Sequence, residues 1–336
     1  MATDSETPLA TGSQARKGTF WRGKRVLVTG ARGFVGSNLR PRLAETGCGL
    51  ICPSRQGYDL LEPGQVRRML ADTRPHVVLY LAGFIGGSRA NKECPADFLY
   101  QNPPMGTRML HEAWRAGVEK YLTLMGGCSY PALAPSPIKE TELWKAYPQP
   151  ESAPYSLAKA MGAVQDEAYR RRYSFNAVVP VPGNLYGPHD NYDLRNSHVI
   201  SALIRKLYEA KIQGVAEIVM WGMGRPVRDF IYVEDAWEAI QLAAASYDRS
   251  ELINTSSGVG VTIAELVVTT AELTGQQGRV RWAASKPDGQ MVNGYDVTRM
   301  REWLDYAPQT SLRKGLRKTI AWFEGNYAYA RLEVGT

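Results

Sequence analysis

The chain has 336 residues, of which 44% are hydrophobic and 22% charged, and its formal net charge is +7. This balance is typical of a folded globular protein and argues against a disordered or fibrous chain. No apolar run approaches the roughly 20 residues that a membrane-spanning helix requires, so we expect a soluble protein.

The positive charge raises the question of nucleic-acid binding. The basic residues are scattered, however, and the longest run, Arg170 to Arg172, falls at the end of a predicted helix. We therefore expect no nucleic-acid partner; a positive surface also suits a phosphorylated small molecule.

The four cysteines, Cys48, Cys52, Cys94 and Cys128, fit neither a disulfide framework nor a paired metal motif. We therefore expect no metal and a reducing, cytoplasmic setting. Residues 1–20 lack the apolar segment of a secretory signal and are interpreted as a disordered leader.

Apolar runs then alternate with amphipathic stretches. The patterns predict strands at 25–29, 49–53, 76–82, 120–125 and 176–181, and helices at 34–46, 63–73, 107–117 and 156–173. This alternation predicts an α/β fold with right-handed βαβ units and a doubly wound parallel sheet of Rossmann type.

The later chain gives mixed signals, with a helix at 199–210, a strand at 217–221 and a helix at 262–274. We expect a smaller mixed C-terminal lobe over the carboxyl edge of the sheet, where ligands bind in such folds. The predicted dinucleotide-binding domain spans 21–185 with return segments at about 229–260. The predicted substrate lobe comprises 186–228 and 261–330.

A glycine-rich turn directly follows the first strand and opens a helix. Glycines let the backbone approach a pyrophosphate, which lies at the positive end of the helix. The GxxGxxG spacing is typical of the short-chain dehydrogenase variant, whereas the alternative is a structural turn. The expected cofactor-binding residues are Gly30, Arg32, Gly33, Phe34, Val35 and Gly36.

The end of the second strand indicates which dinucleotide is bound. An NAD site usually has a carboxylate there for the ribose 2′-hydroxyl, but this chain continues with Arg55 and no acid. Arg55 and Arg32 suit a 2′-phosphate, although both are also ordinary surface residues. We expect NADP(H) to be preferred, with NAD(H) possible, and Asp59 and Leu60 to hold the adenine edge.

Tyr155 and Lys159 are four residues apart at the start of a predicted helix, so both side chains share one face. A nearby ammonium lowers the pKa of a phenol. The tyrosine then exchanges a proton with a carbinol oxygen as hydride moves. The pair is weak evidence alone and stronger after a glycine-rich βαβ start.

Other motifs follow the fourth strand and continue into the lobe. By residue type alone, Cys128 is a small buried residue and His198 a histidine at a helix start. Trp221 and Arg228, seven residues apart, combine an aromatic plane with a guanidinium that suits a diphosphate. A polar loop around Asp288 is placed to close such a site.

Together these segments resemble the extended short-chain dehydrogenases of the NAD-dependent epimerase/dehydratase family that act on nucleotide sugars. Within it they most resemble the 3,5-epimerase/4-reductase that acts on GDP-4-keto-6-deoxymannose. The resemblance covers Lys24 to Phe323. It depends on segments 81–87, 128–131, 153–159, 184–191, 197–199, 219–222 and 285–289.

The resemblance implies roles for named residues. Tyr155 and Lys159 would carry the redox proton chemistry, and Cys128 and His198 the epimerisation acid/base chemistry. Arg32 and Arg55 would bind NADP, with Leu81 and Ala82 beside the cofactor. The implied substrate contacts are Gly126, Asn184, His198, Val199, Trp221, Arg228 and Asp288. The family also implies a homodimer with a four-helix interface.

Two positions depart from the family pattern. Gly126 replaces a serine or threonine whose hydroxyl helps to hold the keto oxygen, and Val292 and Asn293 replace a basic pair near the substrate. Both changes leave the identity of the sugar open, with a heptose or an antibiotic sugar as alternatives to the fucose precursor, and Gly126 also bears on the catalytic rate.

The leading hypothesis is an NADP-dependent epimerase/reductase that acts on a nucleotide-diphospho-sugar with a 4-keto group. One alternative is an epimerase with tightly held NAD(P) and no net redox change. Another is a non-catalytic dinucleotide sensor; the intact Tyr155, Lys159, Cys128 and His198 argue against it, and Gly126 argues mildly for it.

Overall fold

A five-stranded parallel sheet forms the centre of the larger domain. The computed structural model describes residues 17–276, 278–285 and 291–330. The strand order is β2-β1-β3-β4-β5, with β1 at Arg25–Thr29, β2 at Gly49–Ile51, β3 at Val77–Tyr80, β4 at Lys120–Thr123 and β5 at Ala177–Val178. The chain leaves β1 in one direction and returns on its other side, so the predicted doubly wound sheet is confirmed.

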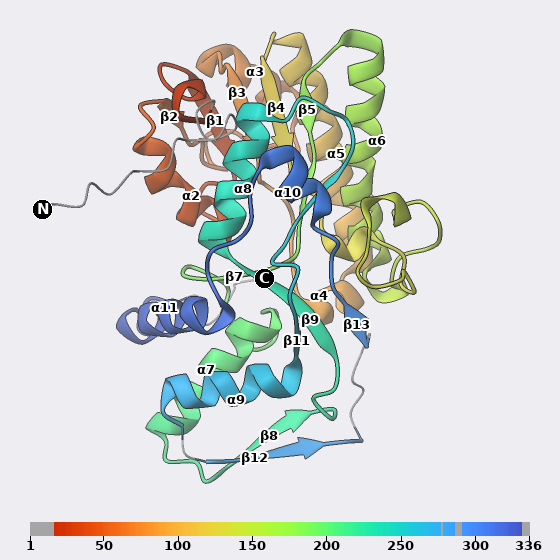
Figure 1. The fold of residues 1–336 in the computed structure, drawn as a ribbon. Coiled ribbons are helices and arrows are strands. Elements are labelled where there is room, and N and C mark those ends of the chain that lie inside the picture. Colours follow the sequence, from red (N-terminus) through yellow and green to blue (C-terminus); the bar gives the residue numbers. More distant parts are fainter. Residues whose placement is uncertain (1–16, 277, 286–290, 331–336) are drawn as a thin grey trace, which may run out of the picture.

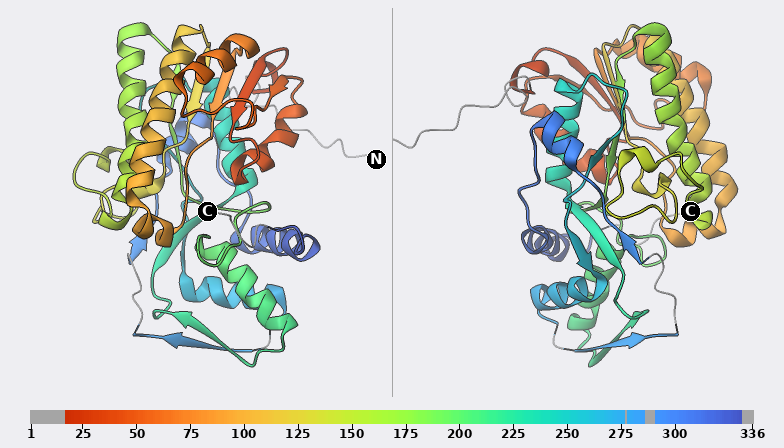
Figure 2. Two further views of the ribbon diagram at one scale, coloured as in Figure 1. Left: turned by 180° about the vertical axis from the view of Figure 1, so that it is seen from behind. Right: turned by 45° about the vertical axis from the view of Figure 1, so that its right-hand side comes forward.

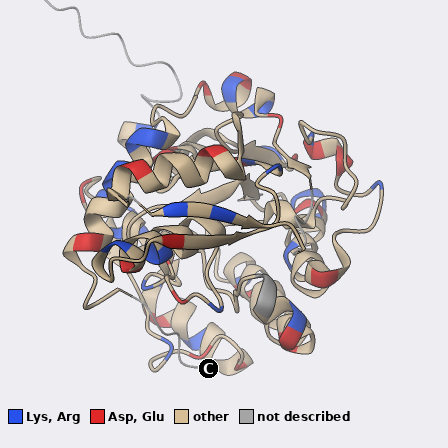
Figure 3. Ribbon diagram, turned by 90° about the horizontal axis from the view of Figure 1, so that it is seen from below, with Lys and Arg blue, Asp and Glu red and all other residues tan. Residues whose placement is uncertain are grey.

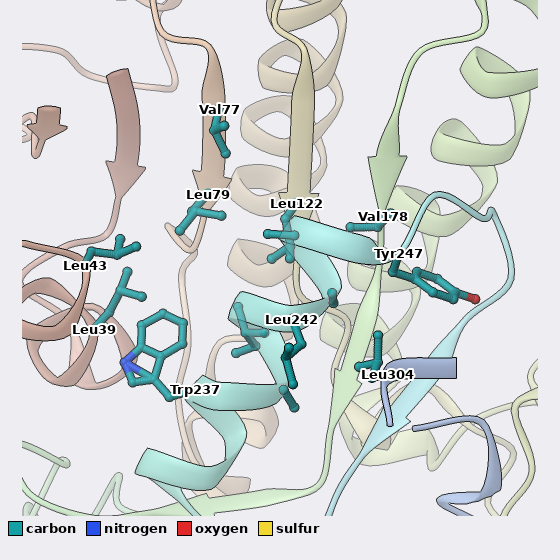
Figure 4. Packing of buried hydrophobic residues seen from close by; sticks show 14 of the residues in the cluster. Leu39, Leu43, Val77, Leu79, Leu122, Val178, Trp237, Leu242, Tyr247 and Leu304 are labelled. Atoms are coloured by element: carbon teal, nitrogen blue, oxygen red, sulfur yellow. The ribbon is translucent and has the colours of Figure 1, made fainter. Parts of the chain in front are cut away.

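Helices cover both faces of this sheet (Figure 1). One face packs on α3 (Pro63–Thr73), α5 (Pro95–Arg115) and α6 (Ala153–Tyr173). The other packs on α2 (Phe34–Ala44), α8 (Val233–Ser246) and α10 (Thr298–Leu304). Successive strand side chains point to opposite faces. Val77 and Leu79 therefore meet Trp237 and Leu304 in one core (Figure 4), and Val78 lies in the other.

The second lobe lies beyond the carboxyl edge of the sheet (Figures 1 and 2). A mixed sheet of four short strands joins it to the larger domain, and β8 and β12 form a separate parallel pair. Its elements are β7 (Asn184–Tyr186), α7 (Val199–Ile212), β8 (Glu217–Trp221), β9 (Val227–Tyr232), β11 (Gly260–Thr262), α9 (Ile263–Thr274), β12 (Arg279–Ala283), β13 (Val292–Asn293) and α11 (Leu312–Gly325). The smaller elements are α4 (Ser88–Glu93), the parallel pair β6 (Pro180–Pro182) and β10 (Ile253–Thr255), and the short 3-10 helices η1 (Gly127–Ser129), η2 (Glu140–Glu142) and η3 (Pro150–Ser152).

Three details differ from the sequence-based prediction. The helix expected to begin at residue 107 begins at Pro95 and runs through Pro103 and Pro104. Proline disfavours a helix interior, but buried Phe98 and Met105 hold the additional turns against the protein. Residues 17–20 are helical and Lys17 pairs with Glu238, so the predicted leader does not extend to residue 20.

The third difference concerns the predicted domain boundary. Met300 and Leu304 of α10 belong to the hydrophobic core of the larger domain, although 261–330 was assigned to the substrate lobe. The boundary was misplaced because α10 follows lobe strands in sequence and returns to the first core only in space.

Acidic and basic residues are interspersed on the face seen in Figure 3. In the described part of the chain, no helix has the length and apolar character needed to cross a membrane. Within the same residues, no group of three or more His, Cys, Asp or Glu side chains is arranged to hold a metal ion.

Asp166 on α6 predicts a pH-dependent stability. Its side chain is fully buried, and neither carboxylate oxygen has a hydrogen-bond partner among the described residues. Burial raises its pKa to about 8. Between about pH 4 and pH 8 the folded state therefore holds a proton that the unfolded state releases, so the free energy of unfolding falls as pH rises. Burial lowers the pKa of the neighbouring Lys120 to about 8, so its opposite contribution lies above this window.

We expect Asp166→Asn to remove most of this dependence and to raise Tm at pH 8 by several degrees relative to wild type. Thermal unfolding followed by circular dichroism from pH 5 to pH 8 measures both effects. Glu167→Gln, which changes the adjacent exposed carboxylate, is the matched control and should behave like wild type. An Asp166→Asn protein that loses stability with pH as steeply as wild type contradicts the prediction.

Candidate active site

The turn between β1 and α2 has no room for side chains. Gly30 has a φ of +67°, and a Cβ on it would lie 2.8 Å from the amide nitrogen of Ala82. A Cβ on Gly36 would lie 2.5 Å from the carbonyl oxygen of Gly30. Both contacts are shorter than atoms tolerate, so this close approach of β1, α2 and the end of β3 requires glycine.

A cavity of about 730 Å³ opens in front of this turn. Such a volume accommodates a bound cofactor, and the N-terminus of α2 faces an anion favourably. Of the predicted cofactor-binding residues, the cavity is lined by Gly30, Arg32, Gly33, Arg55, Asp59, Leu60 and Ala82. The donor set and the glycine cradle therefore fit a dinucleotide.

The other predicted cofactor residues do not line the cavity. They lie in the first turn of α2 or directly after β3. Phe34 packs on the core of the second lobe. Val35 is half-buried in the first turn of α2. The amide of Leu81 donates to the Thr29 hydroxyl oxygen at 3.2 Å.

Arg55 projects from the rim of the cavity with its side chain 78% exposed. Its Nε lies 3.8 Å from Oδ2 of Asp59, whose other oxygen accepts a hydrogen bond from the Leu61 amide. Pro53 and Ser54 line the cavity at the end of β2, where an NAD site places an acid. Asp59 therefore tethers Arg55 loosely and leaves its guanidinium accessible.

Tyr155 and Lys159 occupy the first turns of α6, next to the cofactor cavity. The Lys159 Nζ lies 5.9 Å from the centre of the Tyr155 ring, and Phe98 packs edge-on against that ring at 5.7 Å. Burial lowers the pKa of Lys159 to about 8 and raises that of Tyr155. The sequence predicts that Lys159 lowers the pKa of Tyr155, whereas in the structure burial is the largest effect on this phenol and raises its pKa.

Cys128 lies in a short turn at the carboxyl end of β4, beside Tyr155. A Cβ on Gly126 would lie 3.1 Å from the Cys128 sulfur and 4.0 Å from the Tyr155 hydroxyl oxygen. Gly126 therefore borders both groups. Burial raises the pKa of Cys128, although the hydrogen bond with Ser156 and the charge of Lys159 oppose this effect. The resting side chain is therefore a thiol.

His198 approaches from the second lobe as the exposed N-cap residue of α7. The residues before it press against the loop after β3, where the Gly87 amide donates to the Asn196 carbonyl at 3.1 Å. Val199 is the exposed first residue of α7. This contact holds the start of α7 against the loop after β3, and among the described residues no contact joins His198 to Cys128.

The remaining predicted substrate residues line the lobe. The side-chain amide of Asn184 donates to the Asp229 carbonyl at 2.8 Å. Asn184 therefore anchors β9 next to Arg228. Arg228 is half-buried, and burial lowers its pKa. Trp221 ends β8 with 71% of its surface exposed. Asp288 lies outside the described residues.

Two polar residues near the site were missed from the sequence. Asn102 is buried in α5 and accepts a hydrogen bond from the Phe84 amide at 2.8 Å, which fixes the loop after β3. Tyr295 is buried with its hydroxyl against Gly127. Neither belongs to a recognisable motif; only the departure at Asn293 pointed to the second region.

A glycine turn that faces a cavity and a tyrosine–lysine helix at the same sheet edge define an enzyme of the extended short-chain dehydrogenase type. The model of the NAD dependent epimerase/dehydratase family matches residues 26–255. The chain belongs to this family.

Among its relatives is the GDP-L-fucose synthase of Sinorhizobium fredii, 39% identical over 91% of this chain and 97% of that protein. The GDP-L-fucose synthase of Escherichia coli is also 39% identical, over 90% of this chain and 97% of that protein. The solved structure of a GDP-L-fucose synthetase from Naegleria fowleri bound to NADP superimposes with a TM-score of 0.85. It is 25% identical and covers 92% of this chain and 95% of that one.

Proposed function

We propose that the protein is an NADP(H)-dependent epimerase/reductase that acts on a nucleotide-diphospho-sugar with a 4-keto group. The observation that carries the proposal is that the Cys128 thiol and the Tyr155 phenol border the same residue, Gly126. On the same helix as Tyr155, the Lys159 Nζ lies 3.4 Å from the place of a Cβ on Gly83, which lines the dinucleotide-sized cavity. A reductase needs only the phenol; the second proton-transfer group favours epimerisation in the same site.

In the reduction, bound NADPH supplies the hydride that goes to carbon 4 of the sugar. The Tyr155 hydroxyl gives its proton to the oxygen, so that the ketone becomes an alcohol. Burial keeps this phenol protonated until it is needed. Lys159, with its pKa at about 8, carries a positive charge at neutral pH that stabilises the phenolate left behind.

In the epimerisation, the ketone acidifies the neighbouring carbons. Removal of a proton breaks a C–H bond and places its electron pair on the keto oxygen as an enolate; return of a proton to the opposite face inverts the centre. Cys128 and His198 are proposed as the two acid/base groups, because one lies on the sheet edge and the other on the lobe.

Arg228 and Trp221 are proposed to hold the diphosphate and the base, respectively, and Asn184 to position Arg228 through β9. The relatives named for GDP-L-fucose favour a guanosine nucleotide. Gly126 and Asn293 remove a hydroxyl and a charge that the family has, which favours a sugar other than the fucose precursor.

A proposed homodimer would pair α5 and α6, which lie side by side on the outer flank (Figure 2). Leu157, Met161 and Val164 follow each other at helical spacing on α6 and are exposed, as is Tyr100 on α5. The described cysteines are all free, which agrees with the proposed cytoplasmic location.

The function is tested with NADPH and a panel of GDP-, ADP- and dTDP-linked keto and hydroxy sugars in deuterium oxide. We expect stoichiometric NADPH oxidation with a 4-keto substrate and deuterium uptake at the carbons that flank the ketone. Tyr155→Phe should slow oxidation by about 10²–10⁴-fold but leave exchange. Cys128→Ala should sharply reduce deuterium exchange but leave NADPH oxidation.

The outcomes separate the rivals. Turnover without NADPH consumption indicates an epimerase with no net redox change. Tight cofactor binding with no reaction on any sugar indicates a sensor. A Tyr155→Phe enzyme that oxidises NADPH at the native rate contradicts the assigned role.

We expect Arg55→Ala to weaken NADP binding by about 10–100-fold, because it removes charged hydrogen bonds to the 2′-phosphate. NAD binding should be unchanged, because NAD lacks that phosphate. Titration calorimetry with both cofactors measures the ratio, and Arg172→Ala at the exposed end of α6 is the control. Equal loss of affinity for both cofactors speaks against a 2′-phosphate site.

We expect Val164→Glu to convert the proposed dimer to a monomer, because it places a charge in an apolar interface. Sedimentation velocity measures the mass. Val268→Glu on α9, at 57% exposure against 54% for Val164, is the matched control and should leave the dimer intact. A wild-type protein that sediments as a monomer at micromolar concentration would falsify the interface.

A further inference from the structure

Tyr295 occupies the space that a side chain at residue 127 would fill. A Cβ on Gly127 would lie 2.0 Å from the Tyr295 hydroxyl oxygen and 2.6 Å from the ring carbon that bears it. A Cβ on Gly183 would be in ordinary contact with the ring, at 3.4 Å. The absence of a side chain at Gly127 thus makes room for the phenol.

The position of the phenol is fixed by its surroundings. Tyr295 is 4% exposed and pairs with Ile138 in a parallel bridge. On either side of that bridge, the Ile138 amide donates to Gly294 and the Asp296 amide donates to Ile138. Its ring faces that of Tyr130 at 6.2 Å. The hydroxyl therefore cannot leave the turn that carries Cys128 without displacing buried backbone.

The hydroxyl of Tyr295 is available as a donor. Burial and the neighbouring Cys128 and Asp229 raise its pKa, so it is a neutral phenol at physiological pH. A hydrogen bond from the Asn293 side chain opposes this shift, which means that the phenol oxygen acts as acceptor there. No hydrogen bond donated by the phenol is found within the described residues. Its proton is thus available to an acceptor beside Gly127, and Cys128 follows Gly127 directly in the chain.

Cys128 needs such a donor. Its surroundings disfavour a thiolate through burial, and the charge of Lys159 and the Ser156 hydrogen bond offset this only in part. The other titratable groups around it are the neutral phenols of Tyr155 and Tyr295. Arg228 lies on β9, the strand that pairs with β13, and its charge lowers the pKa of Tyr295.

We propose that Tyr295 is a positioning residue for Cys128, whose hydroxyl, wedged against Gly127, donates to the sulfur when the thiol loses its proton. The inference rests on the proposed function only in one respect, namely that the thiolate removes a proton from the sugar. In that use the C–H proton of the sugar passes to the sulfur while the electron pair moves to the keto oxygen. The sulfur must first have given its own proton to water or to His198.

The experiment measures the rate of Cys128 alkylation by iodoacetamide from pH 6 to pH 10. Trypsin places Cys128, Cys94 and the Cys48–Cys52 pair on separate peptides, so mass spectrometry follows each in one sample. Tyr295→Phe removes only the hydroxyl. We expect its Cys128 to react about five- to tenfold more slowly below pH 8, with the profile shifted to higher pH. Cys94 serves as the internal control and should not change.

Tyr247→Phe is the matched control, because its hydroxyl is also buried but lies in the core of the larger domain and donates to the Glu251 carbonyl at 2.7 Å. Its Cys128 profile should match wild type. Asn293→Ala, on a short edge strand, should shift the profile in the same direction by less, and it decides the question if Tyr295→Phe does not fold. Unchanged profiles in both Tyr295→Phe and Asn293→Ala overturn the proposal.

Deuterium exchange into the keto sugar then tests the link to the reaction. Tyr295→Phe should slow exchange and shift its pH profile as it shifts alkylation, with the KM for the sugar unchanged. If wild type exchanges no deuterium, the proposed function fails, while the alkylation profiles still decide the role of Tyr295. An altered KM with an unaltered pH profile would instead indicate a purely structural role and overturn the proposal.

Discussion

The close approach of backbone at the β1–α2 turn is the constraint on which the rest of the molecule depends. With hydrogen in place of Cβ at Gly30 and Gly36, the start of α2 packs directly on the ends of β1 and β3. The same helix reaches the second lobe: Asn38 donates to the Pro188 carbonyl at 2.7 Å, and Phe34 joins the lobe core. One turn therefore shapes the cofactor cavity and sets the position of the lobe that carries His198 and Arg228.

A buried polar network supports the other side of the site. Tyr130 donates to Asn254, whose amides reach Glu140, Ile138 and Asp296, and Glu140 pairs with Arg299 at 3.5 Å. A buried network with its members satisfied specifies one arrangement, because each alternative leaves a polar group without a partner. This network connects the loop segment after Cys128, residues 130–140, to the segment that carries Tyr295, although the two are far apart in sequence.

Local patterns predicted the elements well where sequence and packing agree. The bounds of β1, α3 and β8 match the prediction because each is a short apolar or amphipathic run with clear ends. The start of α5 was missed because Pro103 and Pro104 argue locally against a helix, and only contacts with distant residues compensate. Gly30, Gly33 and Arg55 were found at the cavity because their signals are local in the βαβ unit.

Tyr295 was missed because its signal is not local. Its hydroxyl fits against Cys128's turn only because residue 127 is a glycine, and no sequence spacing connects these two positions. The direction of the pKa shifts also lies beyond sequence patterns, since burial is their largest cause. The sequence shows that Cys128, Tyr155 and Lys159 are ionisable, but not that a common low-dielectric site disfavours the charged form of each.

That shared burial couples the three groups. The charged form of Lys159 lowers the pKa of Cys128, and the thiolate raises that of Lys159. A negative charge that develops on the sulfur or on the enolate oxygen is therefore least costly while Lys159 is still protonated, which holds below about pH 8. In the proposed reduction, the same ammonium would stabilise the phenolate that Tyr155 becomes when it gives up its proton. The buried lysine can thus support the two chemical steps in turn, because neither step leaves a lasting charge beside it.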